Sequence, residues 1–467
     1  MVFSSLLFLG IFLPAVLGLY YLNKNITYRN IILLIASLIF YAWGEPILII
    51  NMLFSAFVGY ASGFGIAKSK EKQKGALAKF FLILALVIDI GLLGVFKYSG
   101  FFVSNINALF GAGINFAGLA LPLGISFYTF QILSYVIDVY RGEAGLQKSF
   151  YKFLLYVSMF PQLVAGPIVR YIDIEKQINE RHTSAADFEY GVIRFAQGMF
   201  KKIILANSAG SIVDALIGGD MTTLSAGGAW LGIIMYAFQI YFDFSGYSDM
   251  AIGLGHFFGF SFRENFDYPY ISKSITEFWR RWHMSLGTFF RDYVYIPLGG
   301  NRRHQLFNIA VVWFLTGFWH GASWNFIFWG LYYGLWLMLE KKIIFRFIDR
   351  IPGWIRLIYS NIIVLFGWML FYFTDLSRLK QFLLAAFGQN QNGLNLVAKY
   401  QATSHIWFII LMFICATPLI KLIAKKLRSR FKAVYAVILP LTVTFIMAIC
   451  FIMLVKQSYN PFLYFRF

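Results

Sequence analysis

The sequence predicts an all-α integral membrane protein, and three observations support this fold class. Hydrophobic residues make up 59% of the 467 residues and charged residues only 13%, with a mean hydropathy of +0.67. One aqueous core could not bury so much apolar surface, so lipid must act as the solvent. Apolar stretches of roughly 20 residues, the length that crosses a bilayer as a helix, recur along almost the whole chain. The polar connections between them are short.

These stretches define the predicted spanning helices. The first, residues 3–22, lacks a basic leader and a small-residue cleavage site, so we expect a retained spanning helix and not a removed signal peptide. The others are residues 47–67, 77–96, 230–240 with their flanks, 309–319, 326–339, 357–373, 407–420 and 433–455.

Much of the formal charge of +19 gathers in short loops. Such clusters mark the cytoplasmic face by the positive-inside rule, and attraction of a polyanionic donor by a minority of them is the alternative. If Lys24 and Arg29 also lie inside, Met1 lies outside and the last helix delivers Phe467 to the outside. Both termini are therefore expected to be extracytoplasmic. The clusters are Lys68, Lys70, Lys72, Lys74 and Lys79; Lys341, Lys342, Arg346, Arg350 and Arg356; and Lys421, Lys425, Lys426, Arg428, Arg430 and Lys432.

Two segments are too polar and too interrupted for simple crossings. Residues 151–170 contain the run Phe160-Pro-Gln-Leu-Val-Ala-Gly-Pro167, whose two prolines break a helix. Residues 262–300 mix charged residues with aromatic ones. Charged groups are costly in lipid unless they face a cavity or one another, so both segments predict re-entrant or interfacial helices around a wet cavity.

No stretch resembles a soluble domain, a low-complexity linker or an internal repeat. The chain is therefore predicted to be a single membrane-embedded domain over residues 1–467. Polar residues concentrate in its middle, whereas both ends have the pattern of plain spanning helices. The catalytic core is expected at about residues 121–340.

Two of the six histidines are catalytic candidates. His320 lies in Leu315-Thr-Gly-Phe-Trp-His-Gly-Ala-Ser-Trp-Asn325, between two strongly apolar helices, where an ionisable side chain is costly. A neutral imidazole, with an unperturbed pKa of about 6.5, accepts a proton from a hydroxyl at physiological pH, as acyl transfer to an alcohol requires. His283, in Glu277-Phe-Trp-Arg-Arg-Trp-His-Met-Ser285, is the second candidate. Ordinary solvated or packed side chains are expected for His182, His256, His304 and His405.

Other catalytic patterns are missing from the sequence. It contains no Gly-x-Ser-x-Gly nucleophile elbow, no His-Glu-x-x-His zinc helix and no phosphate-binding Gly-x-x-x-x-Gly-Lys-Ser/Thr loop. Gly253, Gly255 and Gly259 match a dinucleotide loop poorly and favour helix packing instead. Cys415 and Cys450 lie in apolar runs, which predicts core packing and not a disulfide or a metal site. A metal enzyme or a serine hydrolase is therefore disfavoured.

Several motifs resemble the membrane-bound O-acyltransferase family. They are Phe242-Asp-Phe-Ser-Gly-Tyr-Ser-Asp-Met250, Trp279-Arg-Arg-Trp-His283, Tyr295-Ile-Pro-Leu-Gly-Gly-Asn-Arg302 and Gly317-Phe-Trp-His-Gly321. The resemblance extends from Pro122 to the last residue, and it is nearest to the bacterial branch typified by the alginate O-acetylation membrane subunit, AlgI. It implies a multi-helix bundle around a tunnel, with His320 as the family's characteristic histidine. Many eukaryotic members carry an asparagine where this chain has His283.

The resemblance also implies an activity. It is O-acetyl transfer in a bacterial cytoplasmic membrane, from a cytoplasmic acyl thioester, acetyl-coenzyme A, to an extracytoplasmic polysaccharide. Alginate-like exopolysaccharide or another envelope polymer is the expected acceptor. An extracytoplasmic SGNH-hydrolase-like acetyltransferase is the expected partner that completes the transfer. Neither a permanently bound cofactor, nor a metal, nor nucleic acid is expected.

In this chemistry the site residues take specific roles. His320 accepts the proton of the attacking hydroxyl, while His283 orients the donor carbonyl, polarises the developing oxyanion or only supports the fold. The phosphates of coenzyme A need cationic partners. The candidates are Arg280, Arg281, Arg302 and Arg303. It is an equal alternative for each of them that it only follows the positive-inside rule and binds no ligand. Asp243 and Asp249 are expected to pair with these arginines.

The C-terminal residues 462–467 fit Phe-x-Tyr-x-x-Phe. This pattern resembles the C-terminal peptide of a small partner protein in teichoic acid D-alanylation, whose tyrosine is thought to carry the acyl group. Tyr464 is therefore a candidate acyl relay that enters the tunnel from the outside. An aromatic anchor at the membrane interface is the alternative.

Two other functions stay open at this point. D-alanyl transfer to teichoic acid lies within the same family but uses a carrier-protein thioester as the donor, and the fused C-terminal motif argues against it. A flippase or secondary transporter would also be polytopic and cationic. It would be expected to show paired halves or repeated broken helices, and the sequence contains no such repeat.

Overall fold

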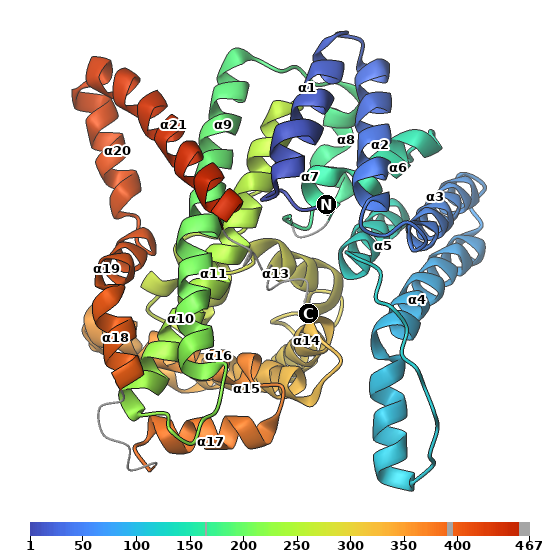
Figure 1. The fold of residues 1–467 in the computed structure, drawn as a ribbon. Coiled ribbons are helices and arrows are strands. Elements are labelled where there is room, and N and C mark those ends of the chain that lie inside the picture. Colours follow the sequence, from blue (N-terminus) through green and yellow to red (C-terminus); the bar gives the residue numbers. More distant parts are fainter. Residues whose placement is uncertain (164–165, 390–395, 457–467) are drawn as a thin grey trace. The chain divides into compact units, whose positions relative to one another are not determined.

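The computed structural model describes residues 1–163, 166–389 and 396–456, and the regular elements among them are all helical (Figure 1). The predicted all-α class is confirmed. Tyr464 and the rest of the C-terminal motif lie outside the described residues.

Contacts divide the chain into two compact units. The first comprises Met1–Phe195 and Ser248–Arg263, and the second comprises Ala196–Tyr247 and Glu264–Phe467. Two division points fall inside continuous helices, α9 (Ala185–Met199) and α11 (Ala226–Phe257). A single domain over residues 1–467 stays a prediction.

In the first unit, α3 (Ile49–Glu71), α4 (Gly75–Phe110) and α5 (Ile125–Arg141) pack against one another. Two glycines of α3 allow the close approach, because a Cβ on Gly59 or Gly63 would collide with side chains of α5. The unit's other helices are η1 (Phe8–Phe12), α1 (Leu13–Tyr21), α2 (Ile26–Ala42), α6 (Phe150–Ser158), α7 (Phe160–Leu163) and α8 (Tyr171–Asn179).

The second unit holds both candidate histidines. Its short helix α12 (Ile275–Arg281) packs against α13 (Met284–Phe290), α15 (Trp324–Lys342) and α16 (Gly353–Tyr372), and α15 forms a hairpin with α14 (Gln305–His320). The unit's other helices are η2 (Phe200–Ala206), α10 (Asn207–Ile217), η3 (Pro269–Ile271), η4 (Arg291–Tyr295), η5 (Ile344–Arg346), η6 (Ile348–Arg350), α17 (Leu376–Ala386), α18 (Leu396–Ser404), α19 (Ile406–Cys415), α20 (Leu419–Arg430) and α21 (Lys432–Lys456).

Four helices among the described residues are long and apolar enough to cross a membrane, namely α3, α4, α16 and α21. The pair α18 and α19, bent by 63°, is a fifth candidate if it acts as one broken span. These helices support a multi-pass membrane protein.

The first predicted span is shorter in the structure than expected. The helix over Phe8–Tyr21 covers about 21 Å at 1.5 Å per residue, against roughly 30 Å of hydrocarbon. The chain turns after it because Asn25 caps the next helix, its side chain accepting hydrogen bonds from the backbone amides of Thr27 and Tyr28.

Both interrupted segments contain broken helices in the structure. Met159 separates α6 from α7, in which Pro161 is the second residue. Trp282 and His283 separate α12 from α13, and each of these helices has only seven residues. Polar side chains are thereby brought to helix ends, where the chain changes direction.

Candidate active site

His320 is the last residue of α14, and two glycines set its position against α15. The helices cross at Gly317 and Gly330, where a Cβ on either residue would collide with the backbone of the facing helix. Such crossings require small residues. The crossing brings the His320 ring to 4.9 Å from the ring of Trp329, the neighbour of Gly330.

The imidazole of His320 lies among aromatic rings and lines a small cavity. The residue is only 6% exposed, and its ring is edge-on to those of Trp319 and Trp329 at 4.9 Å and to that of Phe371 at 5.3 Å. The cavity has a volume of about 10 Å³, room for roughly one water molecule. A tunnel through the protein stays an expectation. The lining residues are Ile240, Phe244, Trp282, His320, Trp329, Trp368 and Phe371.

A buried carboxylate, that of Glu340, anchors helix α12. It accepts hydrogen bonds from the backbone amides of Ile275 and Thr276 at 2.6 and 2.8 Å, and from the Thr276 hydroxyl at 2.7 Å. The first backbone amides of a helix have no acceptor within the helix, and they favour a negatively charged group at the helix N-terminus. Ser274 caps the same turn by accepting from the amide of Glu277 at 3.0 Å. The start of α12 is therefore fixed, and with it the position of His283 just beyond its end.

His283 adopts a left-handed backbone conformation, with φ of +45° and ψ of +53°. This conformation costs a non-glycine residue about 1–3 kcal/mol and persists only where the surroundings enforce it. Asn265 supplies that support. Its backbone oxygen accepts from the Met284 amide at 3.0 Å, and its side-chain oxygen accepts from the Ser285 amide at 3.1 Å and the Ser285 hydroxyl at 2.9 Å.

The same hydrogen bonds assign the ring protons of His283. A backbone amide only donates, so Oδ1 of Asn265 is the acceptor, and Nδ1 of His283, 3.2 Å away, must carry the proton between them. The other ring nitrogen, Nε2, is then an acceptor. His283 lies outside the spanning helices but is only 2% exposed, and burial lowers its pKa to about 3. The ring is therefore neutral at physiological pH.

The structure brings the two candidate histidines to shared neighbours. The indole ring of Trp319 lies 6.0 Å from the His283 ring and 4.9 Å from the His320 ring, centroid to centroid. Phe244 is edge-on to His283 at 4.7 Å and also lines the His320 cavity. Both imidazoles therefore border one aromatic cluster.

The four candidate donor-binding arginines have different settings. Arg281 forms ion pairs with Asp267 at 2.8 Å and Glu277 at 3.0 Å. Arg280 is exposed; partial burial of Lys341 lowers the pKa of that lysine, and the nearby charge of Arg280 lowers it further. Arg281 thus has carboxylate partners, whereas Arg280 belongs to an exposed group of cations.

Arg302 and Arg303 are exposed in the loop that joins η4 to α14. The loop turns at Gly299 and Gly300, whose φ values of +108° and +56° favour glycine. The side-chain amide of Asn308 fixes the loop by donating to the backbone oxygens of Gly300 and Arg303 at 3.0 and 2.7 Å. Two guanidinium groups therefore extend from a well-supported turn.

The expected partners of Asp243 and Asp249 were wrong. Asp243 pairs with Lys202 at 2.5 Å, and Asp249 pairs with Arg194 at 2.7 Å. The reason is that both acids lie on α11, and a Cβ on Gly246 of that helix would collide with backbone next to Lys202. This close helix crossing places a lysine beside the buried carboxylate, which needs an opposite charge nearby.

The other histidines and the cysteines lie apart from this cluster. His182 and His304 are exposed, His405 precedes α19, and the His256 ring is edge-on to that of Tyr190 at 4.7 Å. Cys415 and Cys450 are free thiols. Within the described part of the chain, no group of three or more His, Cys, Asp or Glu side chains is placed to hold a metal ion.

Sequence reasoning missed three polar residues that the structure makes important: Asn265, Glu340 and Lys202. Glu340 is followed by two lysines and resembles the solvated end of a spanning helix, and Lys202 follows another lysine. The Ser274-x-x-Glu277 pattern is a capping signal that does predict the start of α12. No local sequence pattern, however, predicts which residues of distant segments contact α12 or His283.

Comparison with known proteins gives consistent matches. Residues 142–379 match the membrane-bound O-acyltransferase (MBOAT) family. The chain is 43% identical to the probable alginate O-acetylase of Azotobacter vinelandii, over 86% of this chain and 81% of that protein. It is 38% identical to the probable alginate O-acetylase of Pseudomonas putida over the full length of both. It is 37% identical to the peptidoglycan O-acetyltransferase of Helicobacter pylori, over 73% of this chain and 70% of that protein.

Proposed function

This chain belongs to the membrane-bound O-acyltransferase family, and we propose that it provides acetyl groups for O-acetylation of an extracytoplasmic polysaccharide. The proposed donor is acetyl-coenzyme A. Relatives whose names specify acetylation of alginate or peptidoglycan support the reaction class and the type of acceptor. The observation that carries the proposal is the buried imidazole of His320 at a cavity, with Trp319 packed between its ring and that of His283, inside the segment that matches the family.

His320 is the proposed general base. A hydroxyl oxygen attacks the thioester carbonyl carbon and gives up its proton to the imidazole. The carbon–sulfur bond then breaks, the acetyl ester forms, and the proton passes from the imidazolium to the departing thiolate. The products are the acetyl ester and free coenzyme A. The aromatic walls of the cavity limit access of bulk water, which favours transfer over hydrolysis of the thioester.

His283 is a proposed positioning residue. To stabilise an oxyanion through Nε2 it would have to be protonated, and its burial opposes that charge. Its Nδ1 proton is directed toward Asn265. As an acceptor, Nε2 is suited to orient the hydroxyl that reacts.

The indole N–H of Trp329 is the proposed oxyanion donor. Trp329 is 1% exposed, lines the cavity with His320, and its Nε1 has no hydrogen-bond partner among the described residues. A buried donor without a partner costs about 1–3 kcal/mol. A carbonyl oxygen that becomes negative in the transition state would provide the missing acceptor.

The donor's phosphates are proposed to meet the exposed cations of the second unit. Arg280, Arg302 and Arg303 are exposed, and Lys341 lies near Arg280 with its ammonium 5.9 Å from the ring of Tyr295. Arginine forks match phosphate oxygens well. Arg281, which already has two carboxylate partners, would act mainly by holding α12 in place.

We place the protein in a bacterial cytoplasmic membrane with both termini outside. The loop cations support this orientation through the positive-inside rule. It would give Tyr464 access from the outer face, where its hydroxyl would take acetyl from coenzyme A and pass it to an SGNH-hydrolase-like partner. The Phe-x-Tyr-x-x-Phe pattern supports this relay.

Release of free thiol from acetyl-coenzyme A by the purified protein tests the proposed function. We expect release by the wild type and a loss of at least 100-fold in His320→Ala, since general-base catalysis typically contributes 10²–10⁴-fold. His182→Ala is the control, because that histidine is exposed and lies outside the proposed donor-binding loop, so the substitution should leave the rate unchanged.

A second arm offers a D-alanyl thioester of a carrier protein. Turnover of that donor alone would identify a D-alanyl transferase. Equal thiol release by the wild type and His320→Ala would refute the assigned base.

A further inference from the structure

Helix α20 separates its cations onto two faces. It carries five cations and no acidic residue over Leu419–Arg430. At about 100° per residue, Lys426 and Arg430 fall on the same side as Ile423 and Leu427. The other cations, Lys421, Lys425 and Arg428, fall on the opposite side.

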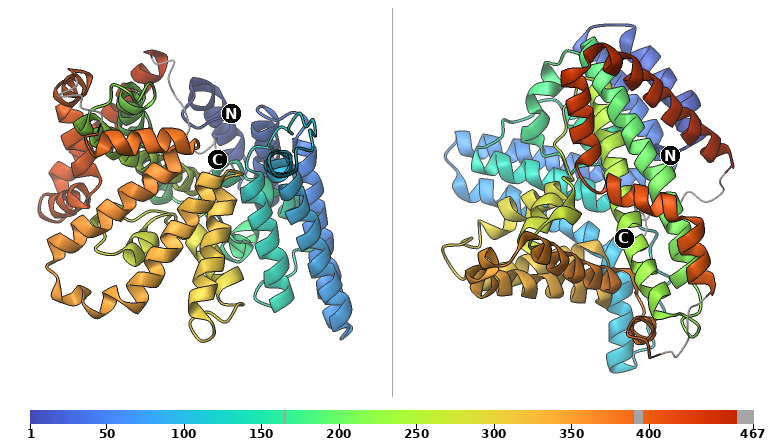
Figure 2. Two further views of the ribbon diagram at one scale, coloured as in Figure 1. Left: turned by 90° about the horizontal axis from the view of Figure 1, so that it is seen from below. Right: turned by 90° about the vertical axis from the view of Figure 1, so that its left-hand side faces the viewer.

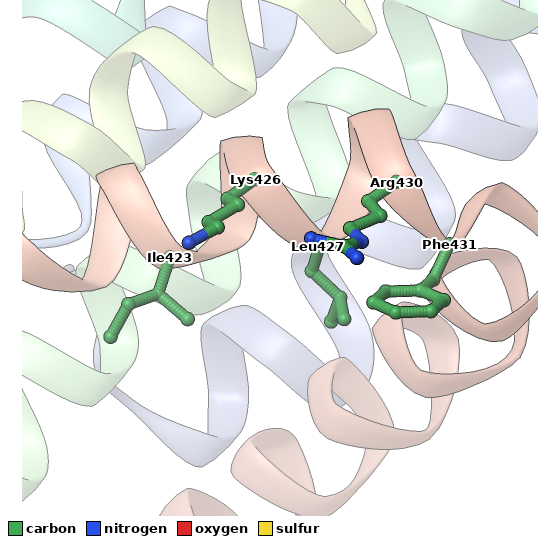
Figure 3. Close-up of a pocket in the computed structure, with 5 residues that line it drawn as sticks. All are labelled: Ile423, Lys426, Leu427, Arg430 and Phe431. Atoms are coloured by element: carbon green, nitrogen blue, oxygen red, sulfur yellow. The ribbon is translucent and has the colours of Figure 1, made fainter.

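The face that carries Lys426 and Arg430 is hollowed into a shallow groove. Ile423, Leu427 and Phe431 form its apolar part, with the two cations between them (Figure 3). The guanidinium carbon of Arg430 lies 5.8 Å from the Phe431 ring centroid. Ile423 and Phe431 are 57% and 51% exposed, so the described residues leave about half of each of these apolar side chains uncovered.

The connections of α20 link this groove directly to a helix that is long and apolar enough to cross a membrane. α19 ends at Cys415, four residues before α20 begins, and the spanning helix α21 begins at Lys432, two residues after α20 ends. Only 6% of the most apolar window of α21 is buried among the described residues, which leaves its apolar surface available to lipid. α20 packs against both neighbours, and Figure 2 shows α20 and α21 in red, joined at one end.

We propose that this groove binds an anionic phospholipid of the surrounding bilayer. The phosphate would lie between Lys426 and Arg430, and an acyl chain would cover Ile423, Leu427 and Phe431. Free phosphate would leave the apolar side chains in water, and an uncharged lipid would leave two cations without a counter-charge. A phospholipid headgroup joined to hydrocarbon satisfies both requirements. This binding site is independent of the proposed acetyl transfer.

The test measures lipid retained by the purified full-length protein. The protein is equilibrated with mixed micelles of phosphatidylglycerol and phosphatidylcholine, and bound lipids are counted by native mass spectrometry. We expect preferential retention of phosphatidylglycerol by the wild type. The double variant Lys426→Gln, Arg430→Gln should weaken that retention about 25-fold, since each basic residue near an anionic lipid surface contributes about a factor of five.

The matched control is Lys421→Gln, Lys425→Gln, which removes the same charge from the opposite face of α20. It should retain phosphatidylglycerol within about threefold of the wild type, and thermal unfolding checks that both variants fold. Equal losses of phosphatidylglycerol retention in the two double variants would show that the cations act through a diffuse electrostatic field, and this result would overturn the proposed site. So would equal retention of both lipids by the wild type, or displacement of the lipid by inorganic phosphate or acetyl-coenzyme A.

Discussion

The Nδ1 atom of His283 lies 3.2 Å from the side-chain oxygen of Asn265, in a turn where His283 has a positive φ. This hydrogen bond fixes the ring and places its proton on Nδ1. The same oxygen accepts from the backbone amide of Ser285, so the strained turn and the orientation of the imidazole depend on one amide side chain. Substitutions at His283 can therefore separate the role of the ring from the requirement of the backbone.

His283→Gly should keep the fold and lose activity. Glycine adopts a positive φ without strain, which offsets part of the cost of about 2–5 kcal/mol of emptying a buried site, so the protein should stay folded, whereas loss of the ring should lower kcat by at least tenfold. His283→Asn should retain more activity, because asparagine tolerates this conformation and supplies a polar group. Thermal unfolding and steady-state thiol release measure both effects. Wild-type turnover by the glycine variant would reduce His283 to a structural residue.

The stability of the protein should fall as the pH drops below about 6, and His283 should contribute to that fall. Its folded-state pKa is about 3, below the unfolded value of about 6.5, so the unfolded chain binds the extra proton first. Between these values the contribution decreases by up to about 1.4 kcal/mol per pH unit as the pH falls. Unfolding midpoints of the wild type and His283→Asn at pH 8 and pH 5 check this. The variant should lose less stability, and identical losses would contradict the assignment.

Trp329→Phe should lower kcat about 10²–10³-fold with little change in KM, the range seen when one oxyanion donor is removed. The substitution retains an aromatic ring beside His320 and removes the indole N–H. Trp324→Phe is the control on the same helix, because Trp324 is 49% exposed. A variant that raises KM while kcat stays constant would indicate a packing role for Trp329 and not a role in the transition state.

Gly330→Ala should disturb the crossing of α14 and α15. The added methyl would collide with the backbone of α14, and overpacking of this kind costs about 1–3 kcal/mol. Activity should fall together with the unfolding temperature, since the crossing holds His320 against Trp329. Gly91→Ala is the comparison, because that glycine has open space around its Cβ position. Equal stability of the two variants would show that the crossing tolerates separation.

Tyr464→Phe tests the acyl relay, because it keeps the ring and removes the hydroxyl. With radiolabelled acetyl-coenzyme A, the wild type should accumulate an acetyl ester that hydroxylamine releases, and the variant should not. Polymer acetylation in cells should fall in parallel. Acetylation at the parental rate in the variant would leave Tyr464 as an interfacial anchor.

The sequence by itself indicated the membrane character and the interrupted helices, and it singled out His320 as the candidate base. Hydropathy, proline positions and the Trp-His-Gly segment are local patterns, so they can be recognised in the sequence without knowledge of the fold. The same kind of reasoning overestimated the first span, because the apolar stretch begins at residue 3 whereas the helix over Phe8–Tyr21 begins five residues later.

Only the tertiary structure decided which polar groups meet. Asn265 supports His283, and Glu340 caps α12. Asp243 pairs with Lys202 and not with one of the candidate donor-binding arginines. Each pairing joins segments separated along the chain. Helix crossings and strained turns determine such pairings, because a buried polar group is stable only beside a partner that packing brings within hydrogen-bond distance.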